Sequence, residues 1–231
     1  MDTMISMNII RRAGVLIAGL STKGKVMGPT SRVAALIVLT TAGLAPAVTT
    51  MAGAAVASAT AQAAGTNLVL NGGFERPANC PQICEYAAGS TAIPHWTVGG
   101  NSVDITAANY WQPAQGTQSL DLSGAASGSV TQQVATTAGT SYILKWSMAG
   151  NPVCGQKVKT MDVFWNGALA DSLKFNTTNH TQASMGWVRR HITVTAKGST
   201  SSVEFADATP DDSRCGAVLD KVSLSLDPPH K

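Results

Sequence analysis

The stretch of sequence that decides the fold is residues 142–149, which read YILKWSMA. Apolar side chains stand at positions 142, 144, 146 and 148, and polar side chains stand at 145 and 147. Successive side chains of a β-strand point to opposite faces of a sheet. The alternation therefore predicts a strand with one buried face and one exposed face.

The same two-residue period recurs on both sides of this stretch, between clusters of Gly, Asn, Pro, Ser and Thr. Asn166-Gly167 separates two such runs and is typical of a β-hairpin turn. No segment after the first 66 residues has apolar residues at helical spacing over three turns, so an all-β fold is expected. We expect strands at 118–122, 129–134, 142–149, 161–165, 169–175, 187–195, 202–206 and 219–226.

Eight or nine strands with one buried face each cannot hide those faces in a single open sheet. Two sheets must pack against each other, and the sequence predicts a β-sandwich of the jelly-roll type. Trp96, Trp146 and Trp187 fall in or beside strand patterns, so we expect them to fill the interior. No internal repeat or heptad occurs after the first 63 residues, which favours one domain.

Residues 1–63 differ sharply in composition from the strands that follow. Basic residues precede an apolar run from Val33 to Leu44, and the segment ends in Ala61-Gln62-Ala63-Ala64. This order is typical of a cleaved export signal, and the apolar run is shorter than the ~20 residues of a membrane-spanning helix. We expect a leader over 1–63 and a secreted domain over 64–231 without a membrane span. Cleavage after Ala47 or Ala59, or a retained N-terminal arm, are the alternatives.

The charge balance changes when the leader is set aside. Residues 64–231 contain 11 Lys and Arg against 12 Asp and Glu, a net charge of −1, whereas the whole chain has +3. No run of Lys and Arg with interleaved aromatic residues occurs in this region, so nucleic acid is not an expected partner. Its 168 residues are enough for one domain with a sizeable core.

All four cysteines follow the leader, at Cys80, Cys84, Cys154 and Cys215. An even number of cysteines in an exported domain predicts two disulfides. Three pairings are possible, and we favour Cys80–Cys84 with Cys154–Cys215, the second closing a loop that contributes about 4 kcal/mol in the chain-entropy model. A zinc site is the alternative, but there is one Cys-x-x-x-Cys spacing only and the histidines are scattered.

Five motifs follow one another in the expected domain and together carry a family resemblance. They resemble domain-of-unknown-function family 642, called choice-of-anchor C in bacteria and known chiefly from plant cell-wall proteins. The resemblance covers Asn67 to Leu226 and implies a secreted, galactose-binding-like jelly roll, associated with cell-wall polysaccharide or pectin-modifying enzymes and without established catalysis. The motifs are Asn71-Gly72-Gly73-Phe74-Glu75, Ile93-Pro94-His95-Trp96 with Val103-Asp104, Gly116 with Ser119-Leu120-Asp121-Leu122, Gly150-Asn151-Pro152, and Cys215-Gly216 with Leu219-Asp220-Lys221-Val222.

The resemblance also implies a metal site. In galactose-binding-like modules, a glutamate near the first strand and an aspartate in the last strand hold calcium, and Glu75 and Asp220 occupy those positions here. Carboxylate oxygens suit Ca²⁺, and an exported domain can use a weak site. We therefore expect a structural calcium ion at Glu75 and Asp220. The alternative is that Glu75 caps a turn and Asp220 forms a surface salt bridge.

Candidate ligand-binding residues follow from the chemistry of sugars, which present apolar faces to aromatic rings and hydroxyls to polar side chains. Tyr110 and Trp111 lie in a segment punctuated by Pro and Asn, and they are the candidate rings. Asp104, Asp121 and Asn151 are the candidate polar partners. A place in the core is equally open for Trp111, and an aspartate at a strand end also makes turns.

No catalytic motif stands out. The expected domain contains no nucleophile elbow, zinc-protease helix or phosphate loop, and nothing singles out a glycosidase pair among its carboxylates. The sequence predicts a monomeric, non-catalytic domain that binds cell-wall or extracellular polysaccharide. The alternative is an extracellular domain that docks or modulates a wall-modifying enzyme such as a pectin methylesterase, and a glycan hydrolase is the third hypothesis.

Overall fold

A computed structural model describes residues 65–210 and 214–228. The expected leader, its cleavage site and the boundary at residue 63 lie outside these residues. Across the described part of the chain, no helix is long and apolar enough to cross a bilayer. The strands found there are β1 Ile83–Ala87, β2 Thr97–Gly100, β3 Ser102–Ala107, β4 Gln118–Asp121, β5 Gly128–Ala135, β6 Ser141–Gly150, β7 Val158–Trp165, β8 Ala168–Asn176, β9 Val188–Thr195, β10 Thr200–Asp207 and β11 Ala217–Leu226.

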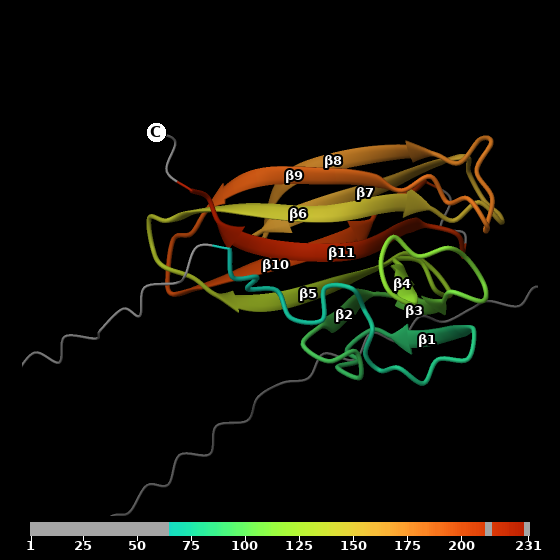
Figure 1. Ribbon diagram of the computed structural model, residues 1–231, viewed down its shortest axis with the longest axis horizontal. Coiled ribbons are helices and arrows are strands. Elements are labelled where there is room, and N and C mark those ends of the chain that lie inside the picture. Colours follow the sequence, from blue (N-terminus) through green and yellow to red (C-terminus); the bar gives the residue numbers. More distant parts are fainter. Residues whose placement is uncertain (1–64, 211–213, 229–231) are drawn as a thin grey trace, which may run out of the picture. The chain divides into compact units, whose positions relative to one another are not determined.

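The strands form two sheets that pack face to face, with β9, β6 and β11 in front of β8, β7 and β10 in Figure 1. The first sheet has six strands in the order β1-β3-β4-β11-β6-β9, and the second has five in the order β2-β5-β10-β7-β8. Neighbouring strands in both sheets are antiparallel. The expected all-β jelly-roll sandwich is confirmed.

All eight strands expected from the sequence are present, but β1, β2 and β3 were not expected. These strands have only four to six residues, and β1 and β2 lie at the edges of their sheets. An edge strand needs no continuous apolar face, so its pattern is weak. The turn-forming Gly99 and Gly100 also interrupt the segment that contains β2.

The core lies between the sheets and contains the face that the 142–149 pattern predicted. Its four apolar residues are each at most 2% exposed, and Trp146 lies 5.6 Å, ring centre to ring centre, from Phe205 of the other sheet. Trp96 is buried as expected. Trp187 meets the expectation in part, because its side chain packs against the core but is only half-buried, and its indole N–H donates to the Gln112 carbonyl at 2.8 Å.

Both expected disulfides are present. The Cα atoms are 5.7 Å apart in the Cys80–Cys84 pair and 5.6 Å apart in the Cys154–Cys215 pair. Cys154 follows β6 and Cys215 precedes β11, and these two strands are paired side by side. The second disulfide therefore ties together two loops at the same end of the six-stranded sheet.

Candidate functional site

Three carboxylates form a row across one end of the six-stranded sheet. Glu85 of β1 lies opposite Asp104 of β3, which lies opposite Asp121 of β4. The neighbours of Asp104 and Asp121 in sequence, Ile105 and Leu120 among them, are fully buried in the core. The neighbours of Glu85 are half-buried and pack against the core. Because side chains alternate along a strand, the three carboxylates lie on the outer face of the sheet.

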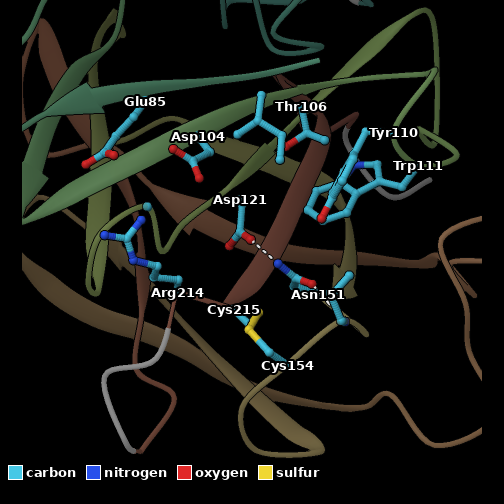
Figure 2. A pocket seen from close by; sticks show the side chains of 13 residues that line it. Glu85, Asp104, Thr106, Tyr110, Trp111, Asp121, Asn151, Cys154, Arg214 and Cys215 are labelled. Carbon is cyan, nitrogen blue, oxygen red and sulfur yellow. Dashed lines mark hydrogen bonds between the residues drawn. A yellow bond between two sulfur atoms is a disulfide. The ribbon is translucent and has the colours of Figure 1, made fainter.

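This row forms one wall of a pocket of about 380 Å³. The segment after β3 closes the pocket on one side, and the loops joined by the Cys154–Cys215 disulfide close it on another. Figure 2 shows Tyr110 and Trp111 at one end of the pocket and Arg214 near Glu85 at the other. Residues from five separate parts of the chain therefore meet in one hollow.

Asp121 is the most firmly held of the three carboxylates. It is 2% exposed and accepts hydrogen bonds from the Asn151 side-chain amide at 2.8 Å and from the backbone N–H groups of Ser123 at 3.0 Å and Gly216 at 3.2 Å. Burial raises the pKa of Asp121 to about 8, although these hydrogen bonds act in the opposite direction. The carboxyl fixes the positions of both loops that close the pocket.

Asp104 lies between the other two carboxylates and has unused hydrogen-bonding capacity. Its Oδ1 atom is buried and has no hydrogen-bond partner among the described residues. Burial, with a smaller effect of Glu85, raises the pKa of Asp104 to about 6, and Arg214 acts in the opposite direction. An unpaired buried polar atom costs free energy, and a ligand hydroxyl would supply its missing partner.

The two candidate rings occupy different environments. Trp111 is 2% exposed, and its indole N–H donates to the Ser119 hydroxyl at 2.8 Å. Of the two roles that the sequence left open for Trp111, the structure shows a buried position, and the side chain also borders the pocket. Tyr110 is half-buried, packs at 5.5 Å from Trp111 between ring centres, and also lines the pocket. Tyr110 is the aromatic side chain that a ligand in the pocket would meet.

The structure brings all five candidate ligand-binding residues to this pocket, together with residues that the sequence did not single out. Glu85 and Arg214 add charge, and Ile83 and Val153 add apolar surface that is 43% and 51% exposed. The sequence did not identify Glu85 and Ile83 because both belong to the edge strand β1, which was not predicted. The pairing of β1 with β3 brings them to the pocket.

The candidate metal ligands Glu75 and Asp220 meet at a different place, the loop of residues 113–118. Glu75 accepts hydrogen bonds from the Thr117 backbone N–H at 2.9 Å and hydroxyl at 2.6 Å. Asp220 accepts one from the Gln115 backbone N–H at 2.9 Å, and burial raises its pKa to about 7. Gly116 has a φ of 69°, and a Cβ there would collide with the Glu75 carboxylate. The two carboxylates therefore clamp one loop from two sides.

This clamp has part of what calcium requires. Two carboxylates converge, but Ca²⁺ takes six to eight oxygen ligands, and among the described residues no cluster of three or more His, Cys, Asp or Glu side chains is placed to hold a metal. Backbone carbonyls and water would have to complete the shell. The expected calcium site stays a prediction.

Comparison with known proteins gives one family match and one curated relative. The sequence model of a family described as "Protein of unknown function (DUF642)" matches residues 67–225. Halomucin of Haloquadratum walsbyi (strain DSM 16790 / HBSQ001) is 31% identical over 169 residues. The alignment covers 70% of this chain but only 2% of Halomucin.

Solved structures of low sequence identity include carbohydrate-binding modules. A family 35 module from Clostridium thermocellum is 14% identical, with a TM-score of 0.42 over 61% of this chain and 97% of the module. TmCBM61, solved in complex with β-1,4-galactotriose, is 19% identical, with a TM-score of 0.46 over 70% of this chain and 99% of the module.

Proposed function

Because the chain belongs to the DUF642 family, as its five motifs predicted, we propose a function from the pocket that four of these motifs help to build. The proposed function is the binding of polysaccharide by a non-catalytic, extracellular domain. The ligand would enter the pocket on the outer face of the six-stranded sheet, between the carboxylate row and the loops held by the Cys154–Cys215 disulfide.

The composition of the pocket is the observation that carries this proposal. Its volume of about 380 Å³ falls within the range of about 300–1,000 Å³ that is usual for small-ligand sites. The Asp104 Oδ1 atom offers an unpaired acceptor to a hydroxyl, while Tyr110, Ile83 and Val153 offer apolar surface. A sugar ring has both kinds of surface, and these groups would bind it from two sides.

The charges in the pocket favour an uncharged sugar. Three carboxyl groups line it, against the single guanidinium of Arg214. A carboxylated sugar would place another negative charge beside Glu85 and Asp104, and this repulsion would weaken its binding. We therefore assign a neutral polysaccharide to the pocket.

An extracellular, non-catalytic role is consistent with two further features. Two disulfides are typical of proteins that fold in an oxidising compartment. Asp121 is committed to three hydrogen bonds that hold the loops, which favours a structural role for it over acid–base chemistry. The binding assay below is run with a reducing-end assay for hydrolysis, and sugar release would contradict the non-catalytic role.

Docking to a wall-modifying enzyme is the alternative to glycan binding. An exposed apolar patch on a sheet face would favour it. The large apolar side chains that are exposed in the described residues are spread over different strands and loops, and two of them, Ile83 and Val153, lie in the pocket itself. Their distribution favours the sugar.

The test is retention of the purified chain on insoluble cellulose, xylan and chitin. We expect retention on at least one polymer, and Tyr110→Ala weakens it by about tenfold, the effect of about 1.4 kcal/mol. Asp104→Asn, which replaces one acceptor oxygen by an amide, weakens retention by a smaller factor. Asp171→Asn on β8, in the other sheet, is the matched control and leaves retention unchanged. Retention on none of the polymers would contradict the proposal, and specific capture of a pectin methylesterase instead would favour the alternative.

A further inference from the structure

A second hollow lies on the outer face of the same sheet, over the strands farthest from the carboxylate row. It has a volume of about 330 Å³ and is lined by residues of β6, β9 and β11. Five basic residues line it, and none of the described residues in its lining is acidic. Arg190 lies opposite Trp146, whose side chain is buried in the core, so the Arg190 side chain does not point to the outer face. We call this hollow the basic groove, defined by Lys145, Arg189, His191 and Lys221.

Strand pairing creates this concentration of charge. Lys145 lies opposite His191 of β9 on one side and opposite Ser223 of β11 on the other, and Arg189 lies opposite Ser147. Three of the 11 Lys and Arg between residues 64 and 231 have their side chains here. They come from three separate strands, so no run of charged residues in the sequence predicts the groove.

Lys221 reaches the groove through an irregularity in β11. The register between β11 and β6 shifts between Asp220 and Ser223, and Lys221 has a φ of 55°. A non-glycine residue in this conformation is strained, and such bulges are used to redirect a side chain. The same bulge turns Asp220 towards the backbone of Gln115.

The basic side chains of the groove lack partners among the described residues, where none of the four forms an ion pair or a side-chain hydrogen bond. Lys145 and His191 lie directly opposite each other, so an anion in the groove would contact both.

The groove continues into neighbouring hollows and can hold an extended chain. On one side, a hollow that contains Trp187 and Gln112 shares Ser147 and Arg189 with the groove. On the other side, a hollow that contains Asn71 and Glu75 shares Lys221 and Ser223 with it. Because Glu75 would repel an acidic polymer there, the polymer would extend from the groove towards Trp187. Crossing from β9 over β6 to β11 spans roughly 10 Å. A polymer with repeated charges fits this shape better than a single small anion.

We propose that the basic groove is a second binding site, separate from the pocket of the three carboxylates, and that it binds a polyanionic polysaccharide. Carboxylate or sulfate groups along the polymer would contact Lys145, Arg189 and Lys221, and the half-buried Trp187 would pack against a sugar ring beside them. Arginine and lysine suit these acceptors, since arginine binds them through two parallel N–H groups and lysine as a point charge. The two disulfides favour an extracellular glycan over a nucleic acid.

The test measures the dissociation constants of the purified chain for polygalacturonate, dextran sulfate and uncharged dextran. We expect binding to polygalacturonate, to dextran sulfate or to both, and none to uncharged dextran. Binding weakens as salt rises from about 20 mM to 500 mM, because salt screens exposed charges. If the chain binds polygalacturonate but not dextran sulfate, the groove recognises carboxylated sugars. If it binds both polymers, the groove recognises a high density of negative charge, whichever group carries it.

Two double variants distinguish binding in the groove from nonspecific attraction of a polyanion to any exposed cation. Lys145→Gln with Arg189→Gln weakens polyanion binding at least tenfold. Lys174→Gln with Lys197→Gln, which removes two exposed cations elsewhere on the chain, changes it less than twofold. Equal losses in the two double variants would overturn the proposal, and so would binding to duplex DNA with no binding to either polyanionic polysaccharide. Unchanged melting temperatures of the variants show that both are folded.

The two sites are distinguished by crossing the variants. Tyr110→Ala leaves polyanion binding unchanged, and the Lys145→Gln, Arg189→Gln variant leaves retention on neutral polymers unchanged. Loss of both activities in either variant would show one shared site and overturn the assignment of a second one. Failure of retention on neutral polymers, with polyanion binding intact, would contradict the pocket alone.

Discussion

Asp121 illustrates at the scale of single residues how the fold and the pocket depend on each other. Its carboxyl group joins β4 to Asn151 after β6 and to Gly216 before β11. It is fully buried, and desolvation opposes its charged form more strongly than the surrounding hydrogen bonds favour it. The group that holds the pocket loops in place is therefore also a buried acid with an unusual pKa.

This environment predicts a pH-dependent stability with a defined sign. The pKa of Asp121 is about 8 in the folded protein against an ordinary value of 3.8, so between about pH 4 and 8 the folded state binds more protons than the unfolded state. Stability then falls as pH rises, and the raised pKa values of Asp104 and Asp220 act in the same direction. We expect the melting temperature to fall by about 2–8 °C from pH 5 to pH 8, as about 1–2 kcal/mol would cause in a domain of this size.

Asp121→Asn tests the assignment of this effect. The variant melts at a lower temperature than the parent chain at both pH values, because the amide cannot keep all three hydrogen bonds. The difference between pH 5 and pH 8 becomes smaller, while Asp171→Asn leaves it as in the parent. Calorimetry checks both statements, and an undiminished pH dependence in Asp121→Asn would refute the role of this residue.

The two tryptophans next to loops show where sequence reasoning fails at the same scale. Trp111 is buried against Ser119, whereas Trp187 is half-buried beside Gln112. Trp111 follows a strand and Trp187 precedes one, and the two-residue period of a strand does not extend into loops. The period therefore cannot predict which of the two rings is buried. The tertiary packing of residues 108–117 determines that.

At the scale of elements, the loop of residues 113–118 depends on contacts from both ends of the domain. Glu75, from the segment before β1, binds its second half, and Asp220 of β11 binds its first half. Gly72 supports the arrangement, because its backbone lies so close to the Val222 carbonyl that a Cβ would collide with it. The Asn71–Glu75 motif therefore serves to join the start of the domain to its last strand.

Calcium would strengthen this clamp if it binds there. With a dissociation constant of ~10⁻⁴ to 10⁻³ M, 10 mM calcium stabilises the fold by about 1.4–2.7 kcal/mol. We expect this to raise the melting temperature by about 3–11 °C relative to EDTA, and Glu75→Gln to abolish the rise. Identical melting curves in calcium and EDTA would rule out the metal and leave Glu75 and Asp220 as hydrogen-bonding groups.

The strands show which structural elements can be predicted from the sequence alone. Central strands such as β6 carry a full apolar face and were predicted with nearly correct bounds. The Glu85–Asp104 pair and the basic groove depend on which strands become neighbours. The pairing of strands that are distant in sequence does not affect the local alternation of apolar and polar residues. The sequence therefore identified Asp104 and Asp121 as separate candidates but did not predict the pocket that they share.

At the scale of the whole described domain, one sheet face carries two opposite charge patterns. The carboxylate row crosses β1, β3 and β4, and the basic groove crosses β11, β6 and β9. The net charge of −1 for residues 64–231 does not reveal this separation, because a net charge sums all residues regardless of where they lie in the structure. Such a face suits a heterogeneous wall, in which neutral and acidic polysaccharides lie side by side.

The most direct test of polysaccharide binding in the carboxylate pocket is an NMR titration of the ¹⁵N-labelled chain with an oligosaccharide of the neutral polymer that retains it. Three side-chain N–H groups report on separate places: Asn151 and Trp111 on the pocket, and Trp165, which donates to the Thr195 carbonyl at 3.0 Å, on a distant part of the core. We predict that the Asn151 and Trp111 signals shift with the sugar and that the Trp165 signal does not. Unchanged Asn151 and Trp111 signals at saturating sugar would contradict binding in this pocket.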